Sequence, residues 1–297
     1  MEKTAVITKP YSIASKIHDY GLLVKFKLLL FVVFSASFAY LLGVKGDINW
    51  NSFILLSLGG VLVTASANGL NEIFEKDFDK LMIRTQTRPL PAGRMSVNEA
   101  MIACIVFGVS GIFILSNYIN ILSGILGMIA LFTYAFAYTP MKRITPFAVF
   151  MGAIPGAMPP LIGWVAATGE LGVEAFALFT LQFIWQFPHF WAIAWRLDED
   201  YKKGGFNLLP SKGGKDKATA FQIIVYTVSL IPVGLMPFVF HISGIISAVI
   251  VSLAGIGFVW YAVRLYRSCS DKAALQVMFG SIIYLPVVMI ALVLDKI

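Results

Sequence analysis

The chain has 297 residues, of which 58% are hydrophobic and only 13% charged. A soluble domain carries about 25% charged residues, because a folded globule needs a polar surface. This composition therefore excludes an ordinary soluble domain, a disordered chain and a small disulfide scaffold. The 23 Lys and Arg residues outnumber the 16 Asp and Glu residues, giving a net charge of +7 that suits either nucleic acid or the loops of a membrane protein.

Nine apolar runs are long enough to cross a bilayer as helices, which takes about 20 residues each. They cover residues 24–44, 51–71, 98–117, 119–138, 146–166, 173–195, 219–240, 242–264 and 274–294. The sequence predicts an all-α, polytopic membrane protein in which residues 1–297 form a single nine-helix bundle. An odd number of spans puts the two termini on opposite sides of the membrane.

The cations are distributed very unevenly over these predicted loops. All Lys and Arg residues except Lys45 and Lys296 lie on the side of the N-terminus, including Lys3 and Lys9 near the N-terminus itself. Cytoplasmic loops carry the Lys and Arg excess, which predicts a cytoplasmic N-terminus and an external C-terminus. Orientation explains the positive charge, and no nucleic-acid partner is predicted.

A first polar cluster follows the second predicted span. If that helix continues beyond the membrane, Asn71, Glu75 and Asp79 lie on one face at intervals of four residues. Like charges on one face repel each other, a cost that a bound cation would offset. Oxygen ligands suit Mg²⁺, and Arg84 and Arg88 follow closely enough to bind phosphate oxygens. The alternative is a solvated helix end with mixed charges.

A second polar cluster runs along the sixth predicted span. Its members fall within an arc of about 80° on a helical wheel; they are Gln182, Gln186, His189, Arg196 and Asp200. Polar side chains inside an apolar span usually face a bundle interior or a functional cavity. Asp200 is a candidate second metal ligand at the cytoplasmic end. The sequence leaves His189 open as a structural histidine, a haem ligand, a proton acceptor or a phosphate contact.

Both clusters resemble motifs of a known superfamily. The pattern Asn71-x₃-Glu75-x₃-Asp79, with the arginines after it, resembles the first aspartate-rich motif of the UbiA-type intramembrane prenyltransferases. The stretch WQFPHF from Trp185 to Phe190, and the stretch YTPMKR from Tyr138 to Arg143, are similar to the haem branch of that superfamily, the protoheme IX farnesyltransferases.

This resemblance implies a helix bundle with a central cavity that transfers farnesyl from farnesyl diphosphate to the vinyl group of protoheme IX, with Mg²⁺ as cofactor. The product, haem O, would serve terminal oxidase assembly in a bacterial inner membrane, with a haem A synthase or an oxidase assembly as candidate partner. The implied diphosphate contacts are Arg84, Arg88, Lys142, Arg143 and Arg196. The implied catalytic residues are Asp79, Asp200, His189 and Tyr138, and the haem-binding candidates are His189, Gln186 and Trp185.

Two further features of the sequence leave alternatives open. Tyr134 and Tyr138 share a face with Lys142 and are candidates to stabilise a farnesyl cation through their rings. Gly152, Gly156 and three prolines in the fifth predicted span indicate either close helix packing or a kink, or else a broken or recessed backbone that makes room for a tetrapyrrole.

Three other functions compete with farnesyl transfer to haem. The first is a UbiA-type enzyme that prenylates a quinone precursor or a chlorophyllide, which the WQFPHF stretch disfavours. The second is a secondary transporter, which would carry polar sites reachable from both faces. Here the acidic residues gather at one end. The third is a passive haem-binding scaffold, which leaves the acidic face unexplained.

Overall fold

The computed structural model describes residues 12–297, and these are almost entirely helical. The predicted cytoplasmic cations Lys3 and Lys9 lie outside the described residues. The long helices are α2 (Phe26–Gly43), α3 (Trp50–Asp79), α4 (Val97–Ile114), α5 (Ile121–Phe132), α7 (Ala148–Thr168), α8 (Val173–Lys203), α9 (Lys217–Gly234), α11 (Ile245–Ser268) and α12 (Asp271–Leu294). The shorter ones are α1 (Ile13–Leu23), α6 (Thr139–Met141) and α10 (Met236–Val239), with π-helical turns η1 (Leu115–Ile119) and η2 (Thr133–Tyr138).

Eight helical segments within residues 12–297 have the length and apolar composition of membrane spans. They agree with eight of the nine predicted spans to within a few residues, except that α3 continues to Asp79. The ninth, predicted at 173–195, corresponds to α8. With 31 residues α8 is long enough to cross a bilayer, but its polar side chains keep it out of this set. The nine-span count is therefore approximate, and the chain is a multi-pass membrane protein.

Polar caps begin several of these helices at the residues where the apolar runs start. Asn49, Ser96, Asn120 and Ser270 each accept a hydrogen bond from a backbone N–H three residues further along the chain. Such caps satisfy donors that the first turn of a helix cannot pair. The break between α1 and α2 falls at Lys25, whose backbone is left-handed with φ 53°.

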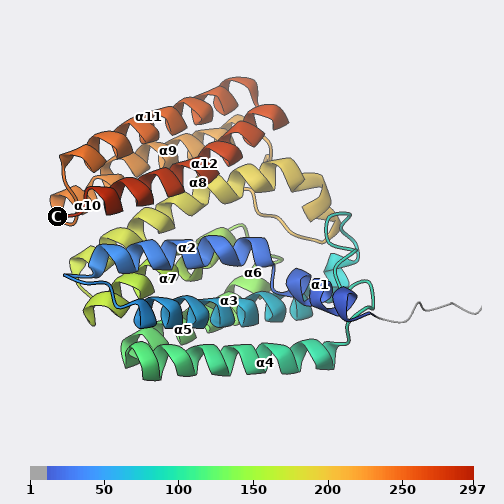
Figure 1. Cartoon of the computed structure of the whole chain (residues 1–297). Coiled ribbons are helices and arrows are strands. Elements are labelled where there is room, and N and C mark those ends of the chain that lie inside the picture. Colours follow the sequence, from blue (N-terminus) through green and yellow to red (C-terminus); the bar gives the residue numbers. More distant parts are fainter. Residues whose placement is uncertain (1–11) are drawn as a thin grey trace, which may run out of the picture.

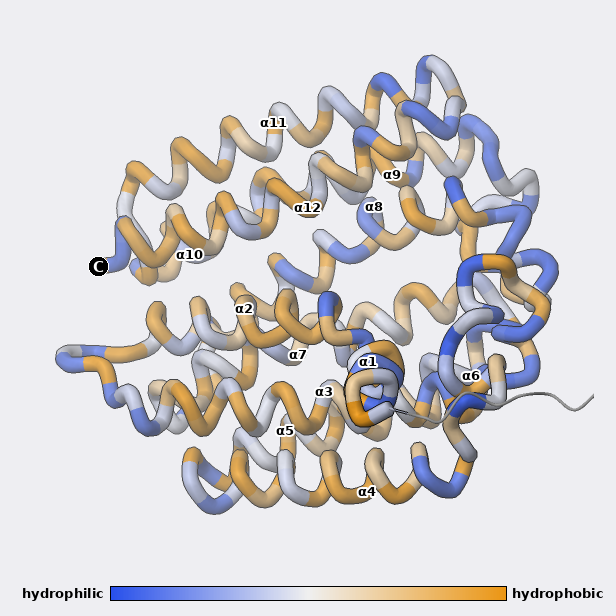
Figure 2. The backbone as a smooth tube through the Cα atoms, turned by 45° about the vertical axis from the view of Figure 1, so that its right-hand side comes forward, coloured by the Kyte–Doolittle hydropathy of each residue, from blue (hydrophilic) through white to orange (hydrophobic). Residues whose placement is uncertain are grey.

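The long helices run side by side in two groups (Figure 1). One apolar core joins α8, α9, α11 and α12, and a second joins α2, α3, α5 and α7. Helix α7 packs against both α2 and α8 and so connects the groups. The C-terminus lies at one end of the bundle, whereas α1, α6 and the two long loops, residues 80–96 and 204–216, lie at the other (Figure 1). Hydrophilic residues concentrate at this loop end (Figure 2).

Candidate active site

The acidic face of α3 is buried at the loop end of the bundle. The helix continues to Asp79, as the spacing of its polar residues predicts, and Asn71 and Asp79 are fully buried there. Glu75 is buried between them, and Glu72 lies beside them with no exposed surface. These side chains belong to the protein interior, which argues against a solvated helix end.

Each of the three predicted metal ligands on α3 has a cationic partner. Arg88 Nη1 lies 2.7 Å from Oδ2 of Asp79, and Lys142 Nζ lies 2.6 Å from Oε1 of Glu75. The third cation is Lys25, which donates to Oδ1 of Asn71 at 2.6 Å. The structure therefore brings the predicted metal ligands and two predicted diphosphate contacts, Arg88 and Lys142, into one cluster.

The charges of this cluster balance one another. Burial acts to lower the pKa of Arg88, but Asp79, Glu72 and Glu75 raise it above its ordinary value, so the guanidinium stays charged. The pKa of Lys25 falls below its ordinary value, mainly because the side chain is buried and also because Arg88 and Lys142 are positively charged neighbours. Three acidic side chains, Asp79, Glu75 and Glu72, thus lie among three basic ones, Arg88, Lys142 and Lys25, in a mostly buried region.

Several oxygens of this cluster fit a hard cation. Oδ1 of Asp79 and both carboxylate oxygens of Glu72 are buried without a hydrogen-bond partner among the residues that the structure describes. Within residues 12–297, no group of three or more His, Cys, Asp or Glu side chains is close enough to hold a metal by itself. Mg²⁺ usually takes only one or two carboxylates and completes its shell with waters and substrate phosphates. The oxygens present therefore fit an ion that binds together with a diphosphate.

Asp200 holds the loop after α3 in place. Its two carboxylate oxygens accept hydrogen bonds from the backbone N–H groups of Ile83 and Arg84, at 2.8 and 3.1 Å. The Arg84 side chain donates to the hydroxyl of Tyr201, one residue beyond Asp200. Helix α8 thereby fixes the loop that carries Arg88.

Two predicted diphosphate contacts are placed differently. The Arg143 guanidinium lies over the Phe78 ring, 3.8 Å from its centroid. Arg196 is exposed on α8 and does not line the central cavity. Their contact with a diphosphate stays a prediction, since the structure gives neither a place beside Asp79.

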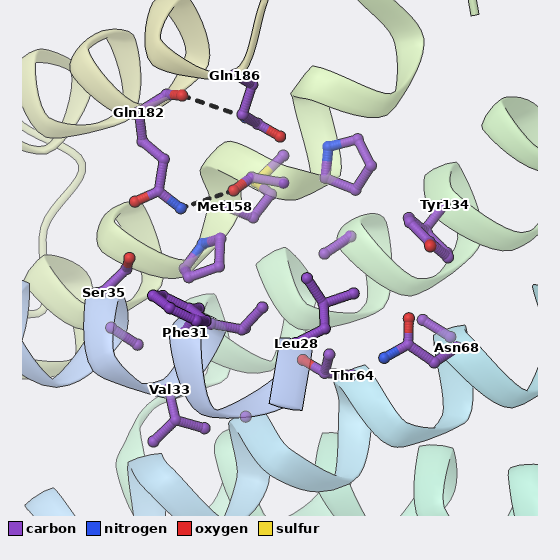
Figure 3. A pocket seen from close by; sticks show the side chains of 18 of the residues that line it. Leu28, Phe31, Val33, Ser35, Thr64, Asn68, Tyr134, Met158, Gln182 and Gln186 are labelled. Atoms are coloured by element: carbon purple, nitrogen blue, oxygen red, sulfur yellow. Dashed lines mark hydrogen bonds between the residues drawn. The ribbon is translucent and has the colours of Figure 1, made fainter. Parts of the chain in front are cut away.

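A cavity of about 450 Å³ lies next to this cluster, among α2, α3, α5, α7, α8 and α12. Its walls are mainly apolar. Figure 3 shows Asn68 and Thr64 of α3 on one side, with Gln182 and Gln186 of α8 across the pocket from them. Asn68 precedes Asn71 and Glu72 by about one helical turn, so the cavity begins where the charged cluster ends. This arrangement fits a molecule with an anionic head and an apolar tail.

Aromatic rings line the cavity near the charged cluster. Tyr134 and Tyr138 are in the π-helical turn η2, with ring centroids 5.2 Å apart, and Lys142 Nζ lies 4.7 Å from the centroid of the Tyr138 ring. π-Helical turns occur frequently at functional sites. The structure therefore places Tyr138 beside Lys142, with Tyr134 next to Tyr138, and a role of these rings in stabilising a farnesyl cation stays a prediction.

Helix α7 is continuous, so its backbone is not broken, whereas a recess that makes room for a tetrapyrrole stays a prediction. It runs from Ala148 to Thr168 through three prolines. Pro160 has no N–H, which leaves the carbonyl of Gly156 without its helical donor. Gln182 Nε2 of α8 supplies that hydrogen bond at 2.8 Å. Gly156 also permits the close approach of α8 to α7, because a Cβ at this position would lie only 1.9 Å from Oε1 of Gln186 on α8.

The three haem-binding candidates all line the cavity. Gln186 donates to the Ala153 carbonyl and therefore contributes to helix packing. His189 Nδ1 lies 2.7 Å from the hydroxyl of Ser281 on α12, and Trp185 donates to the Ser281 carbonyl at 2.8 Å.

The sequence interpretation missed Lys25, Glu72 as a member of the cluster, and Ser281. Lys25 had a signal, because it is a cation at the start of an apolar run, but that signal also fits membrane orientation. Ser281 is one serine in an apolar helix, and nothing in the sequence distinguishes it.

Comparison with known proteins agrees with this geometry. A model of the UbiA prenyltransferase family matches residues 32–283. The protoheme IX farnesyltransferase of Cytophaga hutchinsonii is 50% identical over 284 residues, 96% of this chain and 99% of that protein. The protein of the same name from Christiangramia forsetii is 45% identical, over 95% of each chain.

Solved structures show the same fold. A digeranylgeranylglyceryl phosphate synthase has a TM-score of 0.78 at 22% identity, covering 94% of this chain and 98% of its own. A UbiA homologue from Archaeoglobus fulgidus bound to GPP and Mg²⁺ has a TM-score of 0.64 at 17% identity, covering 92% and 99%.

The fold and the site define a multi-pass membrane protein in which a buried cluster of acidic and basic side chains lies beside an apolar cavity. The family match and the full-length identities identify it further: the chain belongs to the UbiA prenyltransferase family and is a prenyltransferase.

Proposed function

We propose that this prenyltransferase transfers the farnesyl group of farnesyl diphosphate to the vinyl group of protoheme IX and so forms haem O for terminal oxidase assembly. The choice of substrates is supported by the full-length relatives named protoheme IX farnesyltransferase, at 50% and 45% identity. The structural observation that carries the proposal is the neutralised acidic cluster on α3 at the mouth of an apolar cavity.

The first chemical step is departure of the diphosphate. The C–O bond of farnesyl diphosphate breaks, and its electron pair leaves with the diphosphate. Arg88, Lys142 and Lys25 are positioned to exchange their partners on α3 for phosphate oxygens, which stabilises the charge that develops on the leaving group. The farnesyl chain lies in the apolar cavity, where exclusion of water protects the allylic cation.

The second step joins the two substrates. The π electrons of the haem vinyl group form a C–C bond to the farnesyl cation, and the resulting cation takes oxygen from water, which loses a proton. The rings of Tyr134 and Tyr138 can stabilise the farnesyl cation by cation–π contact, worth about 2 kcal/mol each when desolvated.

We propose Mg²⁺ as the cofactor, and the binding of Mg²⁺ together with GPP by the Archaeoglobus fulgidus homologue supports this choice. Asn71, Glu75 and Asp79 would hold the ion. When bound, Mg²⁺ supplies positive charge that stabilises the departing diphosphate. A metal-ligand role for Asp200 stays a prediction, since both of its carboxylate oxygens already accept backbone hydrogen bonds.

We further propose that the enzyme lies in a bacterial inner membrane with its loop end in the cytoplasm. The excess of Lys and Arg at that end supports this orientation, since only Lys45 and Lys296 are at the other end. A haem A synthase or an oxidase assembly would receive the product.

The function is tested by incubating the purified protein with farnesyl diphosphate, Mg²⁺ and protoheme, with 4-hydroxybenzoate, a quinone precursor, as competing acceptor. Mass spectrometry is expected to show a haem adduct carrying one farnesyl group and one hydroxyl. If prenylated hydroxybenzoate forms without any haem adduct, the acceptor is a quinone precursor and not protoheme.

A further inference from the structure

We propose that His189 is an axial ligand of the haem iron through Nε2, and that Ser281 prepares it for this role by accepting a hydrogen bond from Nδ1–H. This inference rests on the proposed function, because haem is there the acceptor substrate. It assigns one of the roles that the sequence leaves open for His189.

The hydrogen bonds around Ser281 define the tautomer of the histidine. The Ser281 hydroxyl donates to the Met278 carbonyl at 2.6 Å, and its oxygen lies 2.7 Å from Nδ1 of His189. A hydroxyl has one hydrogen, so the Ser281 oxygen accepts and Nδ1 carries the proton. In a neutral imidazole, Nε2 then keeps a free lone pair.

The surroundings of His189 hold its ring in one orientation. Trp185 stacks on it with centroids 4.7 Å apart and planes 16° apart, and Phe190 meets it edge-on at 5.5 Å. Trp185 is fixed in turn by its own hydrogen bond to the Ser281 carbonyl. One serine of α12 therefore positions both rings, and His189 lines the cavity.

A phosphate contact is less compatible with the contacts of this histidine. Because Nδ1 carries the proton of the neutral ring, Nε2 could donate to a phosphate only as part of a charged imidazolium, yet Nδ1 is bonded to a hydroxyl instead of a carboxylate that would stabilise that charge. The oxygens of α3 already have their own cations in Lys25, Lys142 and Arg88.

The imidazole is also unique in its position. Of the three histidines of the chain, His18 and His241 are exposed and do not line the cavity.

This pattern is the one that metal-binding histidines show. Such a histidine donates its second ring N–H to an acceptor, which sets the tautomer, the ring orientation and the basicity of the ligating nitrogen. Neutral imidazole is a common ligand of haem iron. A bond from Nε2 to the iron would hold the porphyrin against α8 and α12, while the α3 cluster holds the diphosphate.

The test compares two ligands, haem and metal-free protoporphyrin IX, which differ in the iron alone. Binding to the full-length protein in detergent is measured by quenching of tryptophan fluorescence. We expect His189→Ala to weaken haem binding by about 100-fold and Ser281→Ala by about 10-fold, while metal-free porphyrin binding changes by less than about twofold. Adding imidazole to His189→Ala is expected to restore the absorption spectrum of bound haem.

A matched control removes a hydroxyl elsewhere. Ser252 on α11 donates to the Ala248 carbonyl and does not line the cavity, so Ser252→Ala should leave both affinities unchanged. If His189→Ala unfolds at a lower temperature than the wild type, Ser281→Ala, which keeps His189, provides an independent comparison of haem and metal-free porphyrin affinities.

The inference is overturned if haem and metal-free porphyrin lose affinity equally in His189→Ala, since the residue would then act by packing. It is also overturned if the spectrum of bound haem is the same in wild type and His189→Ala. In both cases a wild-type protein that still makes the haem adduct leaves the proposed function intact. Failure of the wild type to make that adduct overturns the proposed function instead.

Discussion

Asp79 has one carboxylate oxygen on Arg88 and the other without a hydrogen-bond partner among the residues described. Such a carboxylate can bind an arginine in the absence of substrate and a metal ion when the diphosphate is bound. Glu75 and Asn71, at successive turns of α3, also have cationic partners, Lys142 and Lys25. The cations thereby remove the repulsion between stacked acids in the absence of substrate.

Replacing Asp79 tests this dual role. We expect Asp79→Asn to lower kcat/KM by at least about 100-fold, the usual effect of removing one group that stabilises developing charge. Asp77→Asn is the matched control, because Asp77 is exposed on the same helix and pairs only with Lys80. Steady-state kinetics and circular dichroism check both variants. Near-normal turnover of Asp79→Asn would contradict the metal site on α3.

Lys25 allows a second test at this scale. Lys25→Gln removes one positive charge but keeps an unbranched side chain at the same left-handed position. Because Lys25 is proposed to bind phosphate oxygens, the KM for farnesyl diphosphate should rise by about 10-fold, as for loss of one charge-assisted hydrogen bond of about 1.5 kcal/mol. The KM for haem should stay the same. A rise confined to the KM for haem would show that Lys25 serves the acceptor.

Residue spacing predicts part of this site and not the rest. Asn71, Glu75 and Asp79 were predictable because a helix places residues four apart on one face. The partner of each was not, since Lys25 and Lys142 come from distant segments and only packing brings them to α3. Asp200 was expected near a metal, but its oxygens point to the backbone of the loop after α3, a contact that depends on the loop's conformation.

At the scale of elements, the contact between α7 and α8 decides the shape of the cavity. Prolines in α7 leave the Gly156 carbonyl free, and Gln182 of α8 donates to it. The sequence indicated close packing or a broken helix as equal alternatives. Packing is what the structure has, because glycine lets the two helices approach and glutamine replaces the lost hydrogen bond.

This contact predicts a selective loss of stability. Gly156→Ala would place a methyl group 1.9 Å from Oε1 of Gln186, so the helices must separate or Gln186 must leave its position. We expect a loss of about 1–3 kcal/mol, typical of overpacking, seen as a lower melting temperature in detergent. Gly257→Ala on α11 is the control, since its Cβ would meet nothing within 4 Å. Equal melting temperatures would show that the Gln186 side chain moves aside without loss of stability, and so that its hydrogen bond to the Ala153 carbonyl does not stabilise the α7–α8 contact.

At the scale of the whole molecule, hydrophilic residues concentrate at one end of an apolar bundle (Figure 2). The sequence predicted this asymmetry, because apolar runs of about 20 residues identify the spans and thereby assign each loop to one end. It did not predict α1, the two π-helical turns or the inclusion of Lys25 in the site. These features depend on local backbone geometry that composition does not determine.

The predicted orientation has a direct measurement. Exposed Lys45 and Lys212 lie in loops at opposite ends, so each can carry a single cysteine as Lys45→Cys or Lys212→Cys, with Cys104 and Cys269 replaced by serine. A membrane-impermeant maleimide added to spheroplasts should label the cysteine at 45 and reach the one at 212 only after lysis. The reverse pattern would invert the topology.

In the proposed mechanism the α3 cluster receives the diphosphate and the apolar cavity receives the prenyl chain. A structure of the protein with Mg²⁺ and farnesyl thiodiphosphate, a slowly reacting analogue, would locate both parts of the substrate. We expect the diphosphate between Asp79 and Arg88, with the chain inside the cavity toward His189. A diphosphate bound instead at the basic pocket of Arg264, Arg267 and Lys272, between α11 and α12, would show that the α3 cluster is not the substrate site.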